Sequence, residues 1–418
     1  MRRMRRGVGR SAFRLSVVVA LALVGCNALI DTKDVHFDPN ATNGGEGQDA
    51  AVETGAGEGG NPTDGGMDSG PCMKNLSADP KHCGRCDHDC LGGTCTAGKC
   101  DPVVLASGLH GPSGIAVGAK DVYVTTYLGN AVLAVAKDAS GTQVLVANEV
   151  KARGVAVVGT TLYWANGDFE FNGTDRKGGI WQCRLPACAL ATRRIIAPGD
   201  FAIFPIPRGD TMFYGEANGG GLISRVPIDG GTKRFVSDNP GGPFGIALDD
   251  VHAYYTGGAP FLYRALLDGG NTDGGPDDER LVPTDRTVGF VAVDDKRVYF
   301  SYAEDNGKGH VVSIAKSAPS GGSINYGSVS DNAFPVGIAL DDKNIYWSTG
   351  GTGTVSTPTG DGKILMCPKA GCGGMPPTVL AIGNFFSGPM ALDETGIYWV
   401  EFGANTQASG RVRKVAKP

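Results

Sequence analysis

The chain has 418 residues, of which 41% are hydrophobic and only 19% are charged, and it contains 66 Gly and 24 Pro. Such a composition is typical of many short strands joined by turns and argues against a mainly helical fold. Loss of the six arginines in the first 25 residues changes the formal net charge from −5 to −11, because 32 basic residues then face 43 acidic ones; with no basic stripe, we expect no nucleic-acid partner.

The first 25 residues have the features of a secretory signal. Six arginines precede an apolar run, residues 15–24, which is too short to span a bilayer comfortably. The run ends in the sequence LVGC at 23–26, which resembles the lipobox of bacterial lipoproteins. The resemblance implies that residues 1–25 are removed and that Cys26 carries the lipid that holds the protein at a membrane. Ordinary cleavage, which would leave Cys26 free or paired, is the alternative.

Residue 27 adds an expectation about location. Asn27 follows the lipobox cysteine in place of aspartate. By resemblance to bacterial lipoproteins, this residue favours sorting to the outer membrane. We therefore expect an outer-membrane lipoprotein of the cell envelope, facing either the periplasm or the cell surface.

Residues 26–71 are predicted to be a flexible acidic tether. Between Asp38 and Pro71 the chain has ten glycines, seven carboxylates and no lysine or arginine. A segment with so little apolar surface cannot form a core and stays extended and solvated. A calcium site is the alternative, but the spaced ligands of a defined loop are missing.

Residues 72–100 are predicted to be a small disulfide-rich module. Apart from Cys26 the chain has ten cysteines, and an even number in an exported protein indicates disulfides. A zinc site is the alternative, because His82 and His88 flank a Cys-x-x-Cys pair, and the spacing leaves the disulfide connectivity open. The six cysteines of the module are Cys72, Cys83, Cys86, Cys90, Cys95 and Cys100.

The sequence HCGRCDHDCLGGTCTAGKC at 82–100 resembles the short stigma-specific-like cysteine-rich modules of secreted proteins. The resemblance covers about thirty residues. It implies a binding or spacing role and assigns no catalytic residue.

Residues 101–418 contain a repeated block, in which a small apolar segment is followed after a short turn by an aromatic strand. Clear copies are GIAV at 114–117 with VYV at 122–124, and GIAL at 337–340 with IYW at 345–347. The steps between aromatic markers are 40 to 52 residues, the period of β-propeller blades. The seven markers are Tyr123, Tyr163, Phe213, Tyr254, Tyr299, Tyr346 and Tyr398.

These repeats predict an all-β fold with one seven-bladed β-propeller. A six-bladed ring is the alternative, because the copy around Phe213 is degenerate. The last repeat ends without a fourth strand, whereas residues 101–106 precede the first repeat without a blade of their own. We therefore expect the N-terminal strand to complete the last blade and to remove two free sheet edges. The GIALD and YW landmarks resemble the NHL and YWTD-like propellers, families that often bind ligands and include some hydrolases, lyases and lactonases.

Two further cysteine pairs occupy the same place in two blades, just after the third strand. They are Cys183 with Cys188, and Cys367 with Cys372. Because the two blades are not adjacent, a shared zinc site is a poor alternative, and we expect two disulfides that staple turns.

Candidate site residues lie in the loops that enter the inner strands and in those that join the second and third strands, since both sets share one face of a propeller. Polar and aromatic residues mix there, as is typical of a surface for a protein, peptide or glycan ligand. For each residue the plainer interpretation is a hydrophilic loop position. The candidate ligand-binding residues are His110, Arg153, Asn166, Asp168, Glu216, Glu304 and Glu401.

The residue types at this face favour a binding scaffold over an enzyme. The positions before the inner strands lack the carboxylates of a metal cage, so we expect no metal and no cofactor. His110 is the only histidine placed at that point as a general base, and no nucleophile-elbow, phosphate-loop or zincin motif occurs. We therefore predict a monomeric, membrane-anchored binding or interaction scaffold without catalytic residues. A lyase or hydrolase acting on an extracytoplasmic substrate is the alternative.

Overall fold

A computed structural model describes residues 75–418 except 150, 168–177, 200, 218–220, 238–241, 244, 258–260, 270–277, 284–286, 305–307, 318–322, 330–334, 353–356, 358, 385–386 and 405–407. The signal segment, Cys26, the tether, Cys72 and Asp168 lie outside the described residues. In the described part of the chain, no helix has the length and apolar character needed to cross a membrane.

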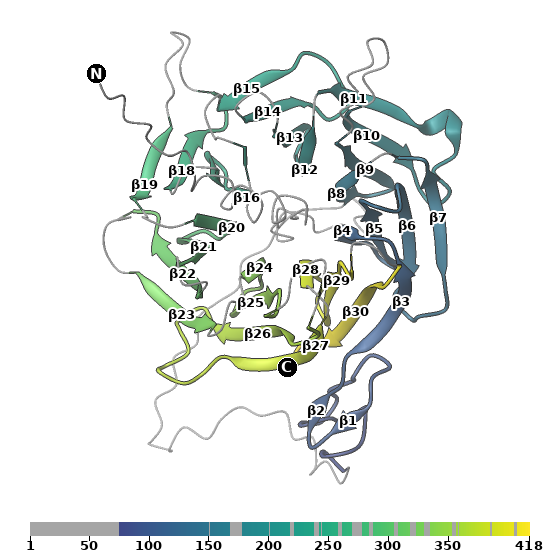
Figure 1. The fold of residues 1–418 in the computed structure, drawn as a ribbon, viewed down its shortest axis with the longest axis vertical. Coiled ribbons are helices and arrows are strands. Elements are labelled where there is room, and N and C mark those ends of the chain that lie inside the picture. Colours follow the sequence, from purple (N-terminus) through teal and green to yellow (C-terminus); the bar gives the residue numbers. More distant parts are fainter. Residues whose placement is uncertain are drawn as a thin grey trace, which may run out of the picture.

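The fold is a ring of seven four-stranded antiparallel sheets, which confirms the predicted seven-bladed propeller (Figure 1). In each blade the first strand lies nearest the centre of the ring and the fourth strand lies at the rim. Blades 1 to 3 comprise β4 (Pro112–Val117), β5 (Asp121–Thr126), β6 (Ala131–Ala136) and β7 (Thr142–Ala147); β8 (Ala152–Val158), β9 (Thr161–Asn166), β10 (Gly179–Arg184) and β11 (Arg194–Pro198); and β12 (Ala202–Arg208), β13 (Thr211–Glu216), β14 (Leu222–Pro227) and β15 (Arg234–Ser237). A short 3-10 helix, η2 (Leu190–Thr192), precedes β11.

The other four blades have the same order. Blades 4 and 5 comprise β16 (Gly245–Leu248), β17 (His252–Thr256), β18 (Phe261–Leu266) and β19 (Glu279–Pro283); and β20 (Thr287–Val293), β21 (Arg297–Ala303), β22 (Gly309–Ala315) and β23 (Ile324–Val329). Blades 6 and 7 comprise β24 (Pro335–Leu340), β25 (Asn344–Thr349), β26 (Gly362–Pro368) and β27 (Thr378–Asn384); and β28 (Ser387–Leu392), β29 (Gly396–Glu401), β30 (Gly410–Ala416) and β3 (Val103–Leu109).

Two predictions about blade count and closure are settled by this topology. The degenerate copy around Phe213 is a complete blade, blade 3, so the six-bladed alternative is wrong. The N-terminal strand β3 pairs with β30 and supplies the missing fourth strand of blade 7, as predicted. The first and last strands of the propeller are thus hydrogen-bonded to each other, which fastens the ring.

The small residues of the repeated block allow the inner strands to approach closely. A Cβ atom at Gly114 would lie 2.8 Å from the carbonyl oxygen of Arg153 and 2.9 Å from the Cα atom of Gly154, both in the next blade. A Cβ atom at Gly337 would lie 3.0 Å from the carbonyl oxygen of Gly388. Glycine is therefore needed where a neighbouring backbone packs directly on the inner strand.

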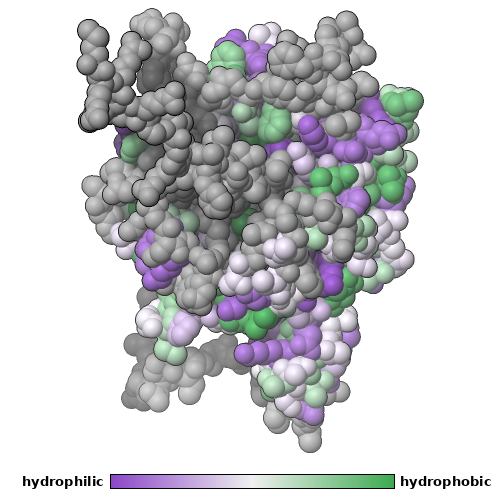
Figure 2. Space-filling model, in the orientation of Figure 1, coloured by the Kyte–Doolittle hydropathy of each residue, from purple (hydrophilic) through white to green (hydrophobic). Residues whose placement is uncertain are grey.

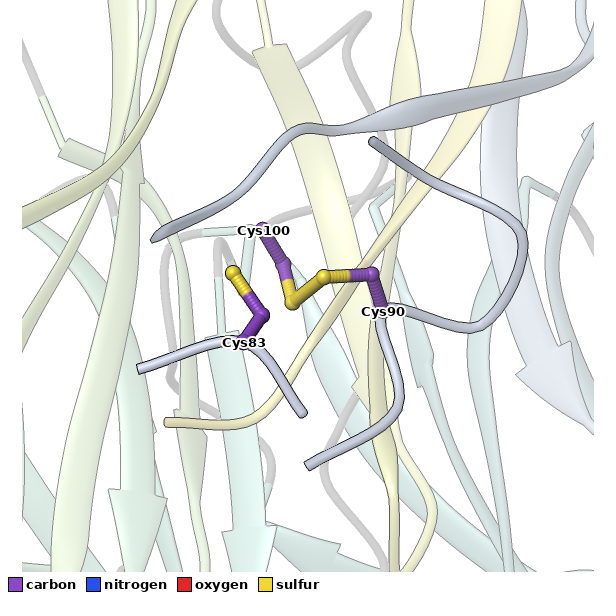
Figure 3. A group of neighbouring side chains, drawn as sticks. All are labelled: Cys83, Cys90 and Cys100. Atoms are coloured by element: carbon purple, nitrogen blue, oxygen red, sulfur yellow. A yellow bond between two sulfur atoms is a disulfide. The ribbon is translucent and has the colours of Figure 1, made fainter. Parts of the chain in front are cut away.

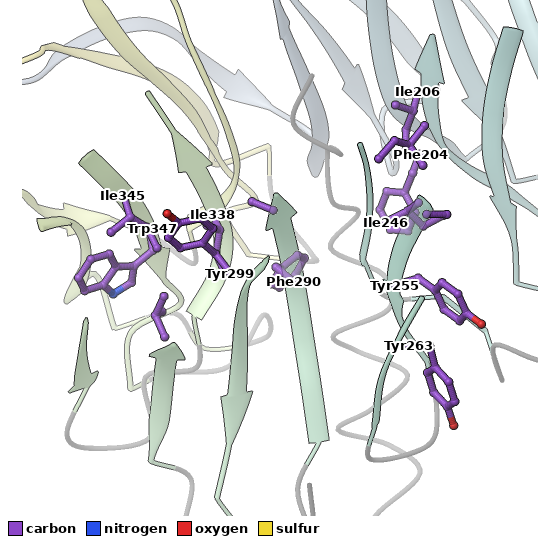
Figure 4. Close-up of a cluster of buried hydrophobic side chains, with 14 of the residues drawn as sticks. Phe204, Ile206, Ile246, Tyr255, Tyr263, Phe290, Tyr299, Ile338, Ile345 and Trp347 are labelled. Atoms are coloured by element: carbon purple, nitrogen blue, oxygen red, sulfur yellow. The ribbon is translucent and has the colours of Figure 1, made fainter. Parts of the chain in front are cut away.

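The hydrophobic core lies between blades, because each sheet is covered on both faces by its neighbours. Figure 4 shows large side chains from blades 3 to 6 that fill these spaces, among them Phe204, Tyr255, Phe290 and Trp347. The rings of Tyr255 and Tyr263 stack with their centroids 5.4 Å apart. Because neighbouring blades cover each other's faces, a single blade is not a stable unit.

The segment before the propeller is disulfide-rich, as predicted, and contains a two-stranded sheet of β1 (Cys95–Thr96) and β2 (Lys99–Cys100). Cys83 is bonded to Cys95 and Cys90 to Cys100, and Cys86 is also disulfide-bonded. The Sγ atoms of Cys83, Cys90 and Cys100 lie within 4.8 Å of one another, and Figure 3 shows the Cys90–Cys100 bond beside Cys83. Sulfur atoms that are bonded to each other are not zinc ligands, so the disulfide interpretation holds for these four cysteines.

The structure also joins Cys183 to Cys188 and Cys367 to Cys372. In both pairs the first cysteine lies in the third strand of a blade and the second in the turn that follows it. In the coloured part of Figure 2, hydrophilic and hydrophobic side chains are interspersed over the blades and the module.

Candidate functional site

The predicted site residues that the structure describes lie where the blade topology puts them, on the face that holds the ends of the second strands. Asn166, Glu216 and Glu401 are the last residues of β9, β13 and β29, and Glu304 follows β21 directly. Strands at the same position in every blade run in the same direction, so these ends share one face of the ring. We call it the loop face.

Glu216 is held inside blade 3. Its carboxylate accepts hydrogen bonds from Ser224 Oγ at 2.6 Å and from Lys233 Nζ at 3.1 and 3.2 Å. The residue is only 5% exposed. Lys233 was not among the residues expected from sequence, because it lies between the third and fourth strands. Glu216 therefore ties the second and third strands of its blade to the segment that leads into the fourth.

Glu401 has the same role in blade 7. It is fully buried, and its carboxylate lies 2.9 Å from Arg413 Nη1 and 3.9 Å from Arg411 Nη1. The guanidinium of Arg413 also lies over the ring of Trp399, 5.3 Å from its centroid. Both arginines come from β30, the strand that carries the closing strand β3. The pair thus stabilises the blade in which the ring closes.

Glu304 contacts a histidine that was not among the residues expected from the sequence. Its Oε1 atom lies 2.8 Å from Nε2 of His310, and the imidazole stacks on the ring of Tyr302 with centroids 4.6 Å apart. Tyr302 and His310 face each other across β21 and β22. A sequence pattern could have indicated this contact: a Tyr-x-Glu segment ends one strand of a hairpin, and a histidine begins the next strand.

Arg153 and Asn166 lie close together where blades 1, 2 and 3 meet. The guanidinium of Arg153 is 2% exposed and lies over the rings of Tyr127 and Phe201, 5.0 and 4.2 Å from their centroids. Asn166 Nδ2 donates to Oε2 of Glu149 at 3.0 Å, and Trp164 Nε1 donates to the same oxygen at 3.2 Å. The aromatic rings and Glu149 hold this part of the face in place.

His110 differs from the others because it is exposed, in the turn between β3 and β4. Within the described residues its side chain makes no hydrogen bond or ion pair. A general base needs a group that orients it and an accessible proton to abstract. His110 is accessible but has no group that orients it among the described residues. Glu216 and Glu401 have such partners but are buried.

The opposite face carries a second, repeated set of charged groups at the turns between first and second strands. Asp249 is an example: its Oδ1 atom accepts hydrogen bonds from the backbone N–H groups of Val251 and His252, and its Oδ2 atom from Tyr254 Oη at 2.8 Å. Lys316 of the next blade completes the set, with Nζ 2.7 Å from Oδ2. We call this arrangement a turn clamp. The clamps are Asp249–Lys316 at 2.7 Å, Asp294–Lys369 at 3.0 Å, Asp341–Lys417 at 3.4 Å and Asp393–Lys137 at 2.8 Å.

The environment of each clamp shifts two pKa values in opposite directions. Burial raises the pKa of Asp249, but the hydrogen bonds from Lys316, the backbone and Tyr254 outweigh it and lower that pKa to about 2. Burial and the adjacent carboxylate raise the pKa of Tyr254. The turn aspartates are therefore structural groups.

A polar cavity of about 650 Å³ lies where the cysteine module meets these turns. The module contributes residues 85 and 87–89, and blades 5 to 7 contribute their first turns. Charges of both signs line it, including Arg85, Asp342, Lys343 and Glu394. Sequence reasoning did not predict this cavity, since its two walls are far apart in the chain.

Comparison with known proteins assigns no family to the chain. No family model matches the chain, and no curated protein matches it significantly. Similar solved structures include a nidogen/laminin complex, with 14% identity, a TM-score of 0.40 and coverage of 52% of this chain and 80% of that one. The PQQ-bound aldose sugar dehydrogenase of Streptomyces coelicolor has 15% identity, a TM-score of 0.45 and coverage of 75% and 96%. The computationally designed Ika8 protein has 11% identity, a TM-score of 0.45 and coverage of 74% and 98%.

Proposed function

We propose that this protein is a lipid-anchored protein of the cell envelope, outside the cytoplasm, whose propeller is a binding scaffold for a protein, peptide or glycan. The lipid on Cys26 would fix the chain to the outer membrane, and the acidic tether would hold the propeller away from the lipid surface. The loop face would be the binding surface.

The observation that supports the binding role is that the buried carboxylates on the loop face pair with cations of their own blades. Glu216 and Glu401 are each paired with cations of their own blade and are nearly or fully buried. A catalytic acid or base must reach the substrate, whereas these groups hold strands together. Their effect is a rigid platform that presents exposed loop residues such as His110, which suits recognition by preformed surfaces.

An enzymatic role has one specific candidate, the Glu304–His310 pair beside Tyr302. A carboxylate 2.8 Å from an imidazole is the geometry of an oriented general base. His310 is only 6% exposed, however, and its ring is covered on one side by Tyr302. We therefore place this pair with the blade-stabilising pairs and keep the lyase or hydrolase role as the second candidate.

The anchoring is tested by replacing the lipidated residue. Cells expressing the Cys26→Ser variant are expected to release the protein from the membrane fraction and to lose incorporation of labelled palmitate. The Cys367→Ser/Cys372→Ser variant is the matched control, because it also replaces cysteine by serine but leaves the lipobox intact. A Cys26→Ser protein that stays in the membrane fraction would overturn the anchoring.

Binding by the loop face is tested with peptide and glycan arrays. We expect ligands retained by the wild-type propeller to be lost in His110→Ala and Tyr127→Ala, and to be kept in Asp250→Asn, which changes an exposed turn on the opposite face. If the face variants bind normally, the surface assignment is wrong. If the propeller instead converts an array compound, and Glu304→Gln and His310→Gln abolish that conversion, the enzymatic candidate replaces the scaffold.

A further inference from the structure

His88 joins the cysteine module to the propeller. Its Nε2 atom lies 2.7 Å from the backbone carbonyl oxygen of Lys417, at the end of blade 7. Its Nδ1 atom lies 2.5 Å from the backbone carbonyl oxygen of Cys83, within the module. The imidazole therefore bridges two parts of the chain that are 329 residues apart in sequence.

The two acceptors determine the protonation state that this geometry needs. A carbonyl oxygen only accepts hydrogen bonds, and a neutral imidazole has one N–H donor and one acceptor nitrogen. With a carbonyl oxygen against each nitrogen, both hydrogen bonds form only when both nitrogens carry a proton. A neutral ring would place a lone pair against an oxygen on one side, and one of the two contacts would be lost.

A second histidine in the same loop, His82, makes its hydrogen bond only when one ring nitrogen is unprotonated. The Nδ1 atom of His82 accepts a hydrogen bond from the backbone N–H of Asp87 at 3.1 Å, so this nitrogen carries no proton. The carboxylate of Asp87 lies 3.6 Å from the same atom and is 90% exposed. Protonation thus makes a hydrogen bond at His88 and breaks one at His82.

The charged groups of the module that surround His88 are mainly acidic. Asp87 and Asp89 flank it in sequence, and Arg85 lines the same cavity. Asp89 accepts a hydrogen bond from Lys81 Nζ at 2.7 Å, which lowers the pKa of its carboxyl group and keeps it ionised.

The propeller side presents charges of both signs to the same cavity. Lys417 Nζ lies 3.4 Å from Oδ2 of Asp341, so its charge is largely balanced. Lys343 and Lys369 are the other cations in the wall, and Asp294, Asp342, Asp393 and Glu394 are the other acids. Lys414, which is 5% exposed, lies near enough to Asp89 to affect its ionisation.

We propose that the module is fastened to the propeller by a protonated His88, so that docking tightens in mildly acidic solution and loosens as the pH rises through the range in which histidine titrates. Histidine is the side chain that changes charge between pH 5 and 8. The bound proton belongs to the docked state, so docking is favoured at low pH and the advantage is lost at high pH. Loosening would open the polar cavity between the module and the first turns of blades 5 to 7.

Hydrogen exchange of the full chain at pH 5.5, 7 and 8, corrected for intrinsic rates, tests the proposal. The informative amide groups are those of Cys83 and Gly84, which donate to the carbonyl oxygens of His88 and Leu76. We expect their protection to fall about tenfold from pH 5.5 to 8, the loss of one charge-assisted hydrogen bond. The amide of Tyr214, a buried residue that pairs with Ser224 inside blade 3, should keep its protection and serves as the internal reference.

Two variants separate the proposed contact from a general effect of pH. In His88→Gln both N–H donors belong to one nitrogen, which cannot reach both carbonyl oxygens, so the protection of the Cys83 and Gly84 amides should be low at all three pH values. His82→Gln removes the opposing, pH-dependent hydrogen bond from Asp87, so in this control the loss of protection with rising pH should persist and become steeper. Selective 15N labelling of histidine gives a second readout: both ring nitrogens of His88 should be protonated at pH 5.5. Equal protection at all pH values in the wild type, the same pH dependence in His88→Gln, or a neutral His88 at pH 5.5 would each overturn the proposal.

Discussion

The interfaces between neighbouring blades fall into two sets that differ at the same position of the repeat. The first set joins blades 4 and 5, 5 and 6, 6 and 7, and 7 and 1; the second set joins blades 1 and 2, 2 and 3, and 3 and 4. In the first set the turn begins with aspartate, and the residue after the third strand of the next blade is lysine. In the second set the turn begins with glycine, and the partner position is apolar. These three pairs are Gly118 with Leu185, Gly159 with Ile228, and Gly209 with Leu267.

The comparison shows that the two positions change together. A half-buried charge is costly unless it is paired, and a lysine opposite glycine would have no carboxylate to meet. The chain uses either both charges or neither at each interface. The clamped set includes the junction of blades 7 and 1, where Asp393 meets Lys137 and where the ring closes. Clamps thus reinforce the place at which the ring can open.

Acid should produce the largest difference between the two sets, because it acts on all four clamps at once. The pKa of Asp249 is about 2, below the ordinary value, and those of Asp294, Asp341 and Asp393 are also lowered. Each clamp therefore adds stability that is complete above about pH 4, the ordinary aspartate pKa, and is lost as the pH falls below it, towards 2 in the case of Asp249. Hydrogen exchange at pH 4 and 2.5 should show loss of protection in the turns of blades 4 to 7 before those of blades 2 and 3. Simultaneous loss in all blades would contradict this.

Removal of one clamp at the junction should have the next largest effect. Asp393→Ala leaves Lys137, whose side chain is 19% exposed, without its carboxylate, and also removes the acceptor for Tyr398 Oη. We expect the free energy of unfolding to fall by about 2 kcal/mol, less than for a fully buried pair. Urea unfolding followed by tryptophan fluorescence measures it. A loss below about 0.5 kcal/mol, as for an exposed pair, would show that the clamps do not matter for closure.

If the clamp is converted into the glycine type of interface, the effect of Lys137→Leu on the free energy of unfolding should change sign. In the wild type, Lys137→Leu removes the partner of Asp393 and should destabilise. In an Asp393→Gly background the same change removes an unpaired, half-buried cation, and we expect it to stabilise by about 1 kcal/mol. The double-mutant cycle measures both steps by urea unfolding. The same sign in both backgrounds would mean that the two positions are not coupled.

Sequence patterns predicted the propeller well because its signal is local and repeated. The small apolar segment, the turn and the aromatic residue recur within about fifteen residues, so each blade was recognised alone and even the copy around Phe213 counted. The lysines of the clamps were missed, although Ala-Lys or Pro-Lys follows four third strands: at 136–137, 315–316, 368–369 and 416–417. Their partners lie in the previous blade, and a reading of one repeat at a time does not compare blades.

The candidate site was predicted by position and not by contact. The order of strands indicates which residues share the loop face, and it placed Glu216, Glu304 and Glu401 in the loops after the second strands. Glu216 and Glu401 are instead the last residues of those strands, and Glu304 follows its strand directly. Whether such a carboxylate is exposed depends on a partner that the repeat does not specify: Lys233 in one blade, His310 in another, Arg413 in a third. The contact of His88 with Lys417 could not be predicted from the repeats at all, since it joins the module to the end of the last blade.

The smallest effect is expected at an exposed ion pair in the unclamped set. Arg208 of blade 3 is bonded to Asp250 of blade 4, and the side chain of Asp250 is 88% exposed. Solvent screens such a pair, so Asp250→Asn should change the free energy of unfolding by less than about 0.5 kcal/mol. Asp249, the adjacent residue, is 18% exposed and clamped to Lys316, so Asp249→Asn under the same conditions should cost several times more. Equal costs for these two neighbours would mean that burial and the lysine partner are not what distinguishes the clamped interfaces.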